Sequence, residues 1–191
     1  EKERSSAEDV EIYAQASKAF YDAVFTFPKP TVAVIQGYCI GGGMGLAVAC
    51  DLRLCEDKSR FAVPAAKLGV GYGYDGIRRL ANLVGPSMVK EIFFTARQFS
   101  AAEAYEMGLV NRVLAPQMLT AYADDYAKRI SENAPLTIES VKAITQSLQL
   151  DEADRDLDAL DALVKGCFAS EDYIEGRRAF MEKRKPKFTG K

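Results

Sequence analysis

Histidine and tryptophan are absent from this sequence of 191 residues, and cysteine occurs only four times. Without histidine, the chain cannot form a Ser-His-Asp or Cys-His catalytic arrangement of its own. The cysteines, at positions 39, 50, 55 and 167, match no CxxC spacing. We therefore expect no metal site and no disulfide bonds, and a reducing compartment is favoured.

A strong net charge and long apolar runs are missing as well. The formal charge is −2, which indicates no bias toward nucleic acid. Glycine, glutamine or charged residues interrupt every apolar run before it reaches the length of a membrane helix, and no signal peptide stands at the start. We expect a cytoplasmic protein that binds neither nucleic acid nor a membrane. The hydrophobic content of 48% is sufficient for one sizeable core.

The most informative feature that is present is the run Gly41, Gly42 and Gly43. It follows an apolar stretch typical of a buried strand (31–36) and precedes a helical stretch (42–50). A turn of this kind leaves backbone N–H groups unpaired at the positive end of a helix, where negative charge is favoured. No Gly-Lys-Ser/Thr follows, and the dinucleotide pattern fails at Leu46. The remaining alternatives are an oxyanion site and tight packing.

The hydrophobic pattern divides the chain into two parts. Residues 1–115 alternate helical and strand-like stretches, which favours a layered α/β fold. Its expected helices include 7–24 and one begun by the capping box Ser100 to Glu103, and its expected strands are 31–36, 52–55, 60–63 and 109–114. Residues 116–191 show helical periodicity only, with helices expected at 117–131, 137–150, 154–169 and 171–183. Their apolar faces predict interfaces with other subunits.

Several motifs in the same order resemble the crotonase superfamily, the enoyl-CoA hydratase/isomerase family. Residues 29–51 are similar to its glycine-rich signature, residues 61–80 to its second active-site segment, and residues 180–188 to its usual ending. The resemblance covers residue 27 to the end. It implies a ββα superhelix core at 1–115, a helical assembly region at 116–191, and a homotrimer or hexamer. Family chains also begin with strands and a loop that this sequence does not contain.

The resemblance implies an enzyme of fatty acid metabolism that acts on acyl-CoA thioesters, with coenzyme A as part of the substrate and no other cofactor. Gly42 takes the position whose N–H stabilises the thioester enolate. The two glutamates of the hydratases are replaced by Gly45 and Ala65. Because neither residue can activate water or deliver a proton, we expect decarboxylase, isomerase or lyase chemistry rather than ordinary hydration.

Replacement catalytic groups are expected in residues 67–77, which partly resemble the loop of the methylmalonyl-CoA decarboxylase type. The candidates are Tyr72 and Asp75. Each has a structural alternative. Tyr72 is equally well explained by packing, and Asp75 by capping the next helix or by pairing with Arg78 or Arg79.

The residues expected to bind substrate are Gly41, Gly45, Ala65, Leu68, Gly73, Phe180 and Lys183. In the family, the positions of Phe180 and Lys183 cover the adenine and contact the phosphates of coenzyme A, and a lysine suits phosphate as a long-reach point charge. The alternative is a frayed basic terminus. A second interpretation of the whole chain is a non-catalytic relative that binds acyl-CoA or serves as an assembly subunit.

Overall fold

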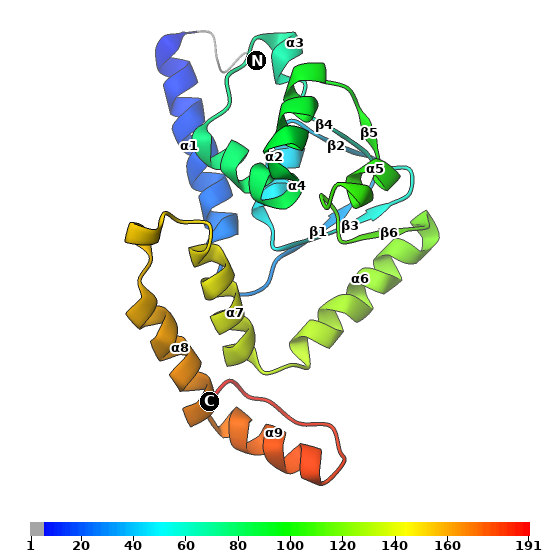
Figure 1. Ribbon diagram of the computed structural model, residues 1–191. Helices are drawn as coiled ribbons and strands as arrows, with labels where there is room; N and C mark the ends of the chain where they lie inside the picture. Colours follow the sequence, from blue (N-terminus) through cyan, green and yellow to red (C-terminus); the bar gives the residue numbers. More distant parts are fainter. Residues whose placement is uncertain (1–5) are drawn as a thin grey trace. The chain divides into compact units, whose positions relative to one another are not determined.

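The computed structural model describes residues 6–191 and divides them between two units (Figure 1). The first unit contains residues 6–27 and Thr31–Leu119, and the second contains Pro28–Pro30 and Thr120–Lys191. Every strand of the described residues belongs to the first unit, whereas the second is helical. The predicted combination of an α/β core and a helical C-terminal region is confirmed.

The first unit contains both helices and strands. They are α1 (Ala7–Phe25), β1 (Val32–Ile35), β2 (Tyr38–Ile40), α2 (Gly42–Ala49), β3 (Leu52–Glu56), β4 (Arg60–Ala62), α3 (Ala65–Leu68), α4 (Tyr74–Thr95), β5 (Phe99–Ser100), α5 (Ala101–Glu106) and β6 (Arg112–Leu114). The strands form two three-stranded sheets, in the orders β1-β3-β6 and β2-β4-β5.

Two consecutive strand-strand-helix repeats build this unit, β1-β2-α2 and β3-β4-α3. The first strands of the two repeats pair in parallel, with Val32 opposite Leu52, and the second strands pair in parallel in the other sheet, with Tyr38 opposite Arg60. This is the expected ββα arrangement. The strands β2 and β5 were not predicted, because they are short and lie directly beside the glycine turn and the capping box, whose patterns dominate these segments.

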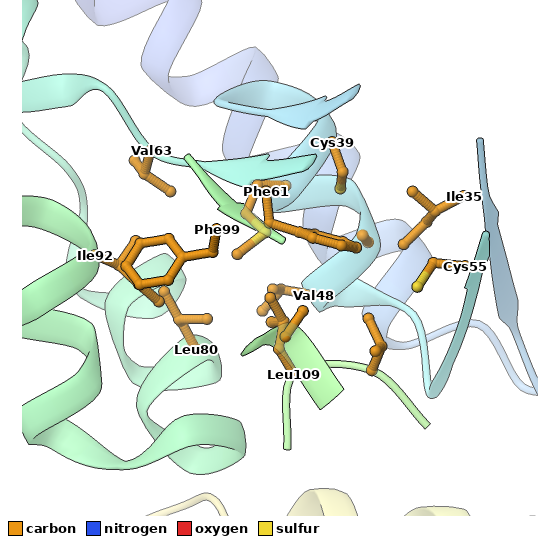
Figure 2. Packing of buried hydrophobic residues seen from close by; sticks show 14 of the residues in the cluster. Ile35, Cys39, Val48, Cys55, Phe61, Val63, Leu80, Ile92, Phe99 and Leu109 are labelled. Carbon is orange, nitrogen blue, oxygen red and sulfur yellow. The ribbon is translucent and has the colours of Figure 1, made fainter. Parts of the chain in front are cut away.

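Buried side chains from both strands and helices fix the position of α2 (Figure 2). Phe61 and Phe99 lie opposite each other on β4 and β5 and are each 1% exposed. Met44 and Val48 bring α2 into the same cluster. Since burial of a large apolar side chain stabilises a fold by about 1.5–3 kcal/mol, these contacts hold the start of α2 firmly against the sheet.

The predicted helix at 7–24 is confirmed as α1, but its apolar face is only partly covered. Val10, Tyr13 and Phe20 are exposed, whereas Tyr21 and Val24 are half-buried. The covered residues lie in the C-terminal half of the helix, and α1 packs against α2. This contact brings α1 to the glycine turn.

Arg53 on β3 links three segments of the first unit from a buried position. Its guanidinium donates hydrogen bonds to the carbonyl oxygens of Leu109, Ala47 and Cys50. Burial lowers the pKa of Arg53, although the nearby Cys50 and Asp51 oppose this effect. The side chain therefore acts as a polar connector between α2 and the chain that leads to β6.

We expect Arg53→Met to lower the free energy of unfolding by at least about 3 kcal/mol, because it leaves several buried carbonyl groups unpaired at about 1–3 kcal/mol each. Urea denaturation followed by circular dichroism measures the change. Arg112→Met is the matched control, since Arg112 is an exposed arginine whose guanidinium donates a hydrogen bond to the backbone carbonyl of the neighbouring Asn111. Equal stability of the two variants would contradict the role given to Arg53.

The second unit consists of helices joined by short turns. They are α6 (Pro116–Ser131), which begins in the first unit, α7 (Pro135–Ser147), the 3-10 turn η1 (Glu152–Asp154), α8 (Leu157–Ala169) and α9 (Glu171–Met181). The helices α7 and α8 pack side by side. Lys142 on α7 donates a hydrogen bond to the carbonyl oxygen of Lys29, which ties residues 28–30 to this unit. No helix within residues 6–191 combines the length and apolar content needed to cross a membrane.

Candidate active site

The glycine turn between β2 and α2 has a backbone conformation that requires glycine. Gly41 precedes the first residue of α2 and has φ 56° and ψ −114°. Its N–H donates to the carbonyl oxygen of Ala62 on β4, and its own carbonyl accepts from the N–H of Gly45. A residue with a side chain rarely adopts positive φ, so Gly41 is fixed by the geometry of the turn.

The first N–H groups of α2 face outward from this turn. Gly42 and Gly43 are both exposed, and the N–H groups of a first helical turn have no acceptor inside the helix. Among the described residues, the backbone hydrogen bonds include none donated by either glycine. With the positive end of the helix dipole behind them, these donors are suited to an oxygen that gains negative charge.

A tyrosine from α1 lies against the first turn of α2. The Tyr21 hydroxyl donates a hydrogen bond of 3.2 Å to the carbonyl oxygen of Gly42. A Cβ atom at Gly42 would lie 3.3 Å from this hydroxyl, and one at Gly45 would lie 3.0 Å from Tyr21 Cζ. The ring therefore fills the space that side chains at positions 42 and 45 would need.

The structure places the other predicted substrate-binding positions on and around α3. Ala65 is buried and begins this helix, whereas Leu68 ends it with 60% of its surface exposed. Gly73 precedes the first residue of α4. Residues 69–73 connect the two helices without regular secondary structure.

Of the two candidate catalytic residues, Tyr72 lies in this connection and Asp75 in the first turn of α4, and both take part in structural contacts. The edge of the Tyr72 ring packs on Phe93, with centroids 4.9 Å apart. The Asp75 carboxylate lies 2.9 Å from Lys18 Nζ and 3.3 Å from the Arg78 guanidinium. The expected alternatives of packing for Tyr72 and pairing with Arg78 for Asp75 are thus observed, and the catalytic role of both residues stays a prediction.

An ion-pair network connects α1 with the start of α4. Lys18 bridges Asp22 and Asp75, and Asp22 also pairs with Arg79, which was an expected partner of Asp75. The hydrogen bonds that Lys18 donates to Asp22 and then to Asp75 raise the pKa of Lys18. Desolvation opposes ionisation of Asp22, but the hydrogen bonds from Lys18 and Arg79 outweigh it, and the pKa of Asp22 is lowered. Since Tyr21 lies between Lys18 and Asp22 on α1, the network holds the helix segment that covers the glycine turn.

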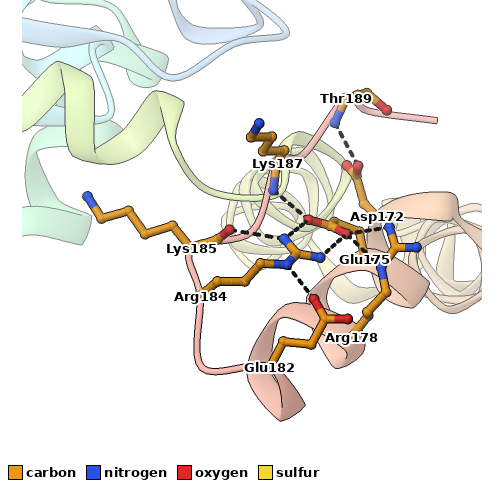
Figure 3. Close-up of polar contacts among 8 residues, drawn as sticks. All are labelled: Asp172, Glu175, Arg178, Glu182, Arg184, Lys185, Lys187 and Thr189. Carbon is orange, nitrogen blue, oxygen red and sulfur yellow. Dashed lines mark hydrogen bonds and ion pairs between the residues drawn. The ribbon is translucent and has the colours of Figure 1, made fainter.

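The predicted coenzyme A contacts belong to the second unit. Phe180 is 82% exposed near the end of α9, and Lys183 follows this helix with a positive φ of 54°. Behind them, the Glu175 carboxylate accepts from Arg178, Arg184 and the backbone N–H of Lys187 (Figure 3).

These contacts hold the tail after α9 in a defined path. Hydrogen bonds from Arg184, then from Arg178 and Lys187, keep the pKa of Glu175 well below its ordinary value. Asp172 accepts from the backbone N–H groups of Thr189 and Gly190. An open, charged cavity of about 620 Å³ lies along this tail, lined among others by Glu175, Arg184 and Lys187.

The cysteines offer no second centre of reactivity. All four are free. Burial raises the pKa of the Cys39 thiol to about 11 and that of Cys55 to about 12, so both are neutral at ordinary pH and poor nucleophiles. Among residues 6–191, no three His, Cys, Asp or Glu side chains gather in a way that could hold a metal ion.

Comparison with solved structures assigns the fold. The chain superposes with a TM-score of 0.90 on an enoyl-CoA hydratase/carnithine racemase from Magnetospirillum magneticum, at 34% identity, covering 99% of this chain and 70% of the other. It matches an enoyl-CoA hydratase from Bacillus anthracis with the same TM-score, at 31% identity, covering 98% and 73%. The two sheets, the ββα repeats and the glycine turn are therefore those of the crotonase superfamily.

Sequence comparison agrees. The profile of the enoyl-CoA hydratase/isomerase family matches residues 1–191, and the chain belongs to this family. It is 34% identical to a crotonyl-CoA hydratase of Syntrophomonas wolfei over 97% of this chain and 72% of the relative. It is 39% identical to a short-chain-enoyl-CoA hydratase of Clostridium acetobutylicum over 82% of this chain and 60% of the relative. In these two matches the aligned region thus spans between 60% and 72% of the relative.

We expect Gly41→Ala to destabilise the protein by about 1–3 kcal/mol, because alanine must adopt the positive φ of the turn. No atom lies within 4 Å of the Cβ position at Gly41, so the cost comes from the backbone and not from a clash. Gly43→Ala is the matched control, since its Cβ position is equally open and its φ is not positive. Equal thermal unfolding midpoints for the two variants would refute the assigned strain.

Proposed function

We propose that this chain forms the catalytic region of an acyl-CoA enzyme that stabilises a thioester enolate at the start of α2. The observation that carries the proposal is the exposed Gly42, whose N–H stands at a helix start that the positive φ of Gly41 fixes. A preorganised donor at this point interacts more strongly with an enolate oxygen than with a neutral carbonyl, which lowers the barrier to enolate formation.

We further propose that decarboxylation, isomerisation or another lyase reaction is the main chemistry, rather than addition of water. Gly45 and Ala65 stand where the family resemblance puts the two glutamates of the hydratases. Ala65 is buried, and Tyr21 occupies the space beside Gly45. Hydration needs one group to activate water and another to deliver a proton, and these two positions supply neither.

Hydration is the second candidate, and the names of the relatives favour it. Crotonyl-CoA hydratase, short-chain-enoyl-CoA hydratase and carnitinyl-CoA dehydratase are among the proteins that the chain resembles. A non-catalytic subunit that binds acyl-CoA is the third candidate. The preserved geometry of the glycine turn favours an enzyme over such a subunit.

We propose that coenzyme A contacts Phe180 and Lys183 and that the chain assembles as a homotrimer or hexamer. Exposed apolar side chains on the C-terminal helices support assembly, because water-exposed surfaces of this kind commonly mark interfaces. Examples are Leu148, Leu157, Phe168 and Ile174, each more than 60% exposed.

Activity toward crotonyl-CoA, malonyl-CoA and methylmalonyl-CoA tests the reaction class. We expect turnover of a carboxylated thioester, with crotonyl-CoA hydration at least about 10²-fold below the rate that an acid and a base would give. Gly42→Pro removes the proposed donor at a helix position that tolerates proline, and should lower kcat by about 10²–10³-fold. Circular dichroism verifies that the variant is folded. Rapid hydration by the unmodified protein would favour the second candidate, and unchanged turnover by Gly42→Pro would refute the oxyanion role.

We expect Lys183→Gly to weaken coenzyme A binding without lowering the stability of the protein. The backbone at position 183 is left-handed, where glycine is usual after a helix, so glycine should not lower the unfolding midpoint and should relieve about 1 kcal/mol of strain. Loss of the ammonium should weaken coenzyme A binding roughly tenfold, in line with about 1.5–3 kcal/mol for a charged hydrogen bond. Isothermal titration calorimetry measures binding. The control is Lys185→Ala, which removes an exposed charge two residues later; if it weakens binding equally, the specific role of Lys183 is wrong.

A further inference from the structure

Tyr21 is a titratable side chain that contacts the glycine turn and that the proposed reaction does not yet use. Its ring comes from α1, 21 residues before Gly42 in the sequence, where it occupies one position of an apolar helix face. In the structure its hydroxyl lies 3.3 Å from the Cβ position of Gly42 and 3.2 Å from that of Gly45. It is thus placed between the two positions that define the candidate site.

The hydroxyl lies within reach of a thioester bound at Gly42. A Cβ position is about 2.5 Å from the backbone nitrogen of its own residue, so the Tyr21 hydroxyl is within about 6 Å of Gly42 N. An oxygen bound to this N–H lies about 2.9 Å from the nitrogen. The α-carbon of the thioester is two bonds beyond that oxygen. These distances therefore allow the hydroxyl and the α-carbon to come close enough for proton transfer.

The contact of the hydroxyl with the Gly42 carbonyl is a long one. A bond of 3.2 Å to the Gly42 carbonyl is longer than the usual 2.5–3.0 Å of an O–H···O hydrogen bond. A phenol carries one donor hydrogen and two acceptor sites, and the hydrogen can rotate toward a new partner without movement of the ring. The ring itself is held by its packing against Gly42 and Gly45.

We propose that Tyr21 is a catalytic residue that exchanges a proton with the α-carbon of the acyl thioester. The inference rests on the proposed function, since it requires an enolate at Gly42. When a bond to the α-carbon breaks heterolytically, its electron pair forms the enolate, whose oxygen accepts from Gly42 N–H. The electron pair then returns to the α-carbon and takes the proton of the Tyr21 hydroxyl, the carbonyl is restored, and the phenolate regains a proton from water.

This role explains why position 45 is glycine. A Cβ atom there would approach Tyr21 Cζ to 3.0 Å, a tighter contact than Cβ atoms normally make, so the ring would have to shift. A side chain at position 45, a carboxylate included, would therefore displace the Tyr21 hydroxyl from its observed place. The chain thus has one proton-transfer group next to the turn, supplied by α1 in place of α2.

Exchange of α-protons with D₂O tests the proposal without knowledge of the overall reaction. Butyryl-CoA is incubated with the protein in D₂O, and proton NMR follows loss of the α-proton signal. We expect Tyr21→Phe to keep the unfolding midpoint and the affinity for butyryl-CoA, while exchange falls by about 10²-fold or more. Tyr13→Phe, a tyrosine on the same helix outside the turn, is the matched control and should exchange at the unmodified rate.

A second variant covers the case in which Tyr21→Phe does not fold. Gly45→Ala retains the Tyr21 hydroxyl but shifts its position, and should also lower the rate of α-proton exchange. The double variant should be little worse than Tyr21→Phe alone, because both act through the same group. Exchange at the unmodified rate in Tyr21→Phe, or in a folded Gly45→Ala, overturns the role of Tyr21 and leaves the enolate function standing. No exchange and no turnover by the unmodified protein overturns the proposed function, and the role of Tyr21 with it.

Discussion

The candidate site depends on the close approach of α1 to α2 at two glycines. The Tyr21 ring occupies the space that Cβ atoms at Gly42 and Gly45 would require, and its hydroxyl bonds to the first carbonyl of α2. On the opposite side, Met44 and Val48 fix α2 in the core. The helix start is thus held between a buried cluster and one aromatic ring. A donor group held in this way needs no reorganisation when charge develops in front of it.

The same segment of α1 connects the glycine turn to the start of α4. Lys18 and Asp22, three residues before and one residue after Tyr21, bind Asp75 and Arg79. Asp75 accordingly has two cationic partners, Lys18 and Arg78, which favour a positioning role for it. A contribution of the loop to catalysis then depends more on Tyr72, whose ring is fixed by Phe93.

Sequence patterns predicted the elements that are long or carry special residues. The helices α1 and α2, the paired strands β1 and β3, and the C-terminal helices were expected within a few residues, and the glycine run 41–43 was expected to open a helix with unpaired N–H groups. The very short strands β2 and β5 were missed, because their pairing is decided by neighbouring strands and not by a local pattern. Tyr21 was also missed as a site residue. The sequence does not distinguish a tyrosine whose hydroxyl faces solvent from one whose hydroxyl contacts the start of another helix. The sequence signal for this contact was the pair of glycines at 42 and 45. It can be interpreted only when the packing of α1 against α2 is known.

The central claim is that the thioester oxygen accepts a hydrogen bond from Gly42 N–H. The carbonyl stretching band of butyryl-CoA labelled with ¹³C at the thioester, measured as an infrared difference spectrum on binding, reports this bond directly. Polarisation by the start of α2 predicts a band at lower frequency than in water, and a return toward the frequency in water when Gly42 is replaced by proline. A bound thioester whose band stays at the frequency measured in water would contradict the account.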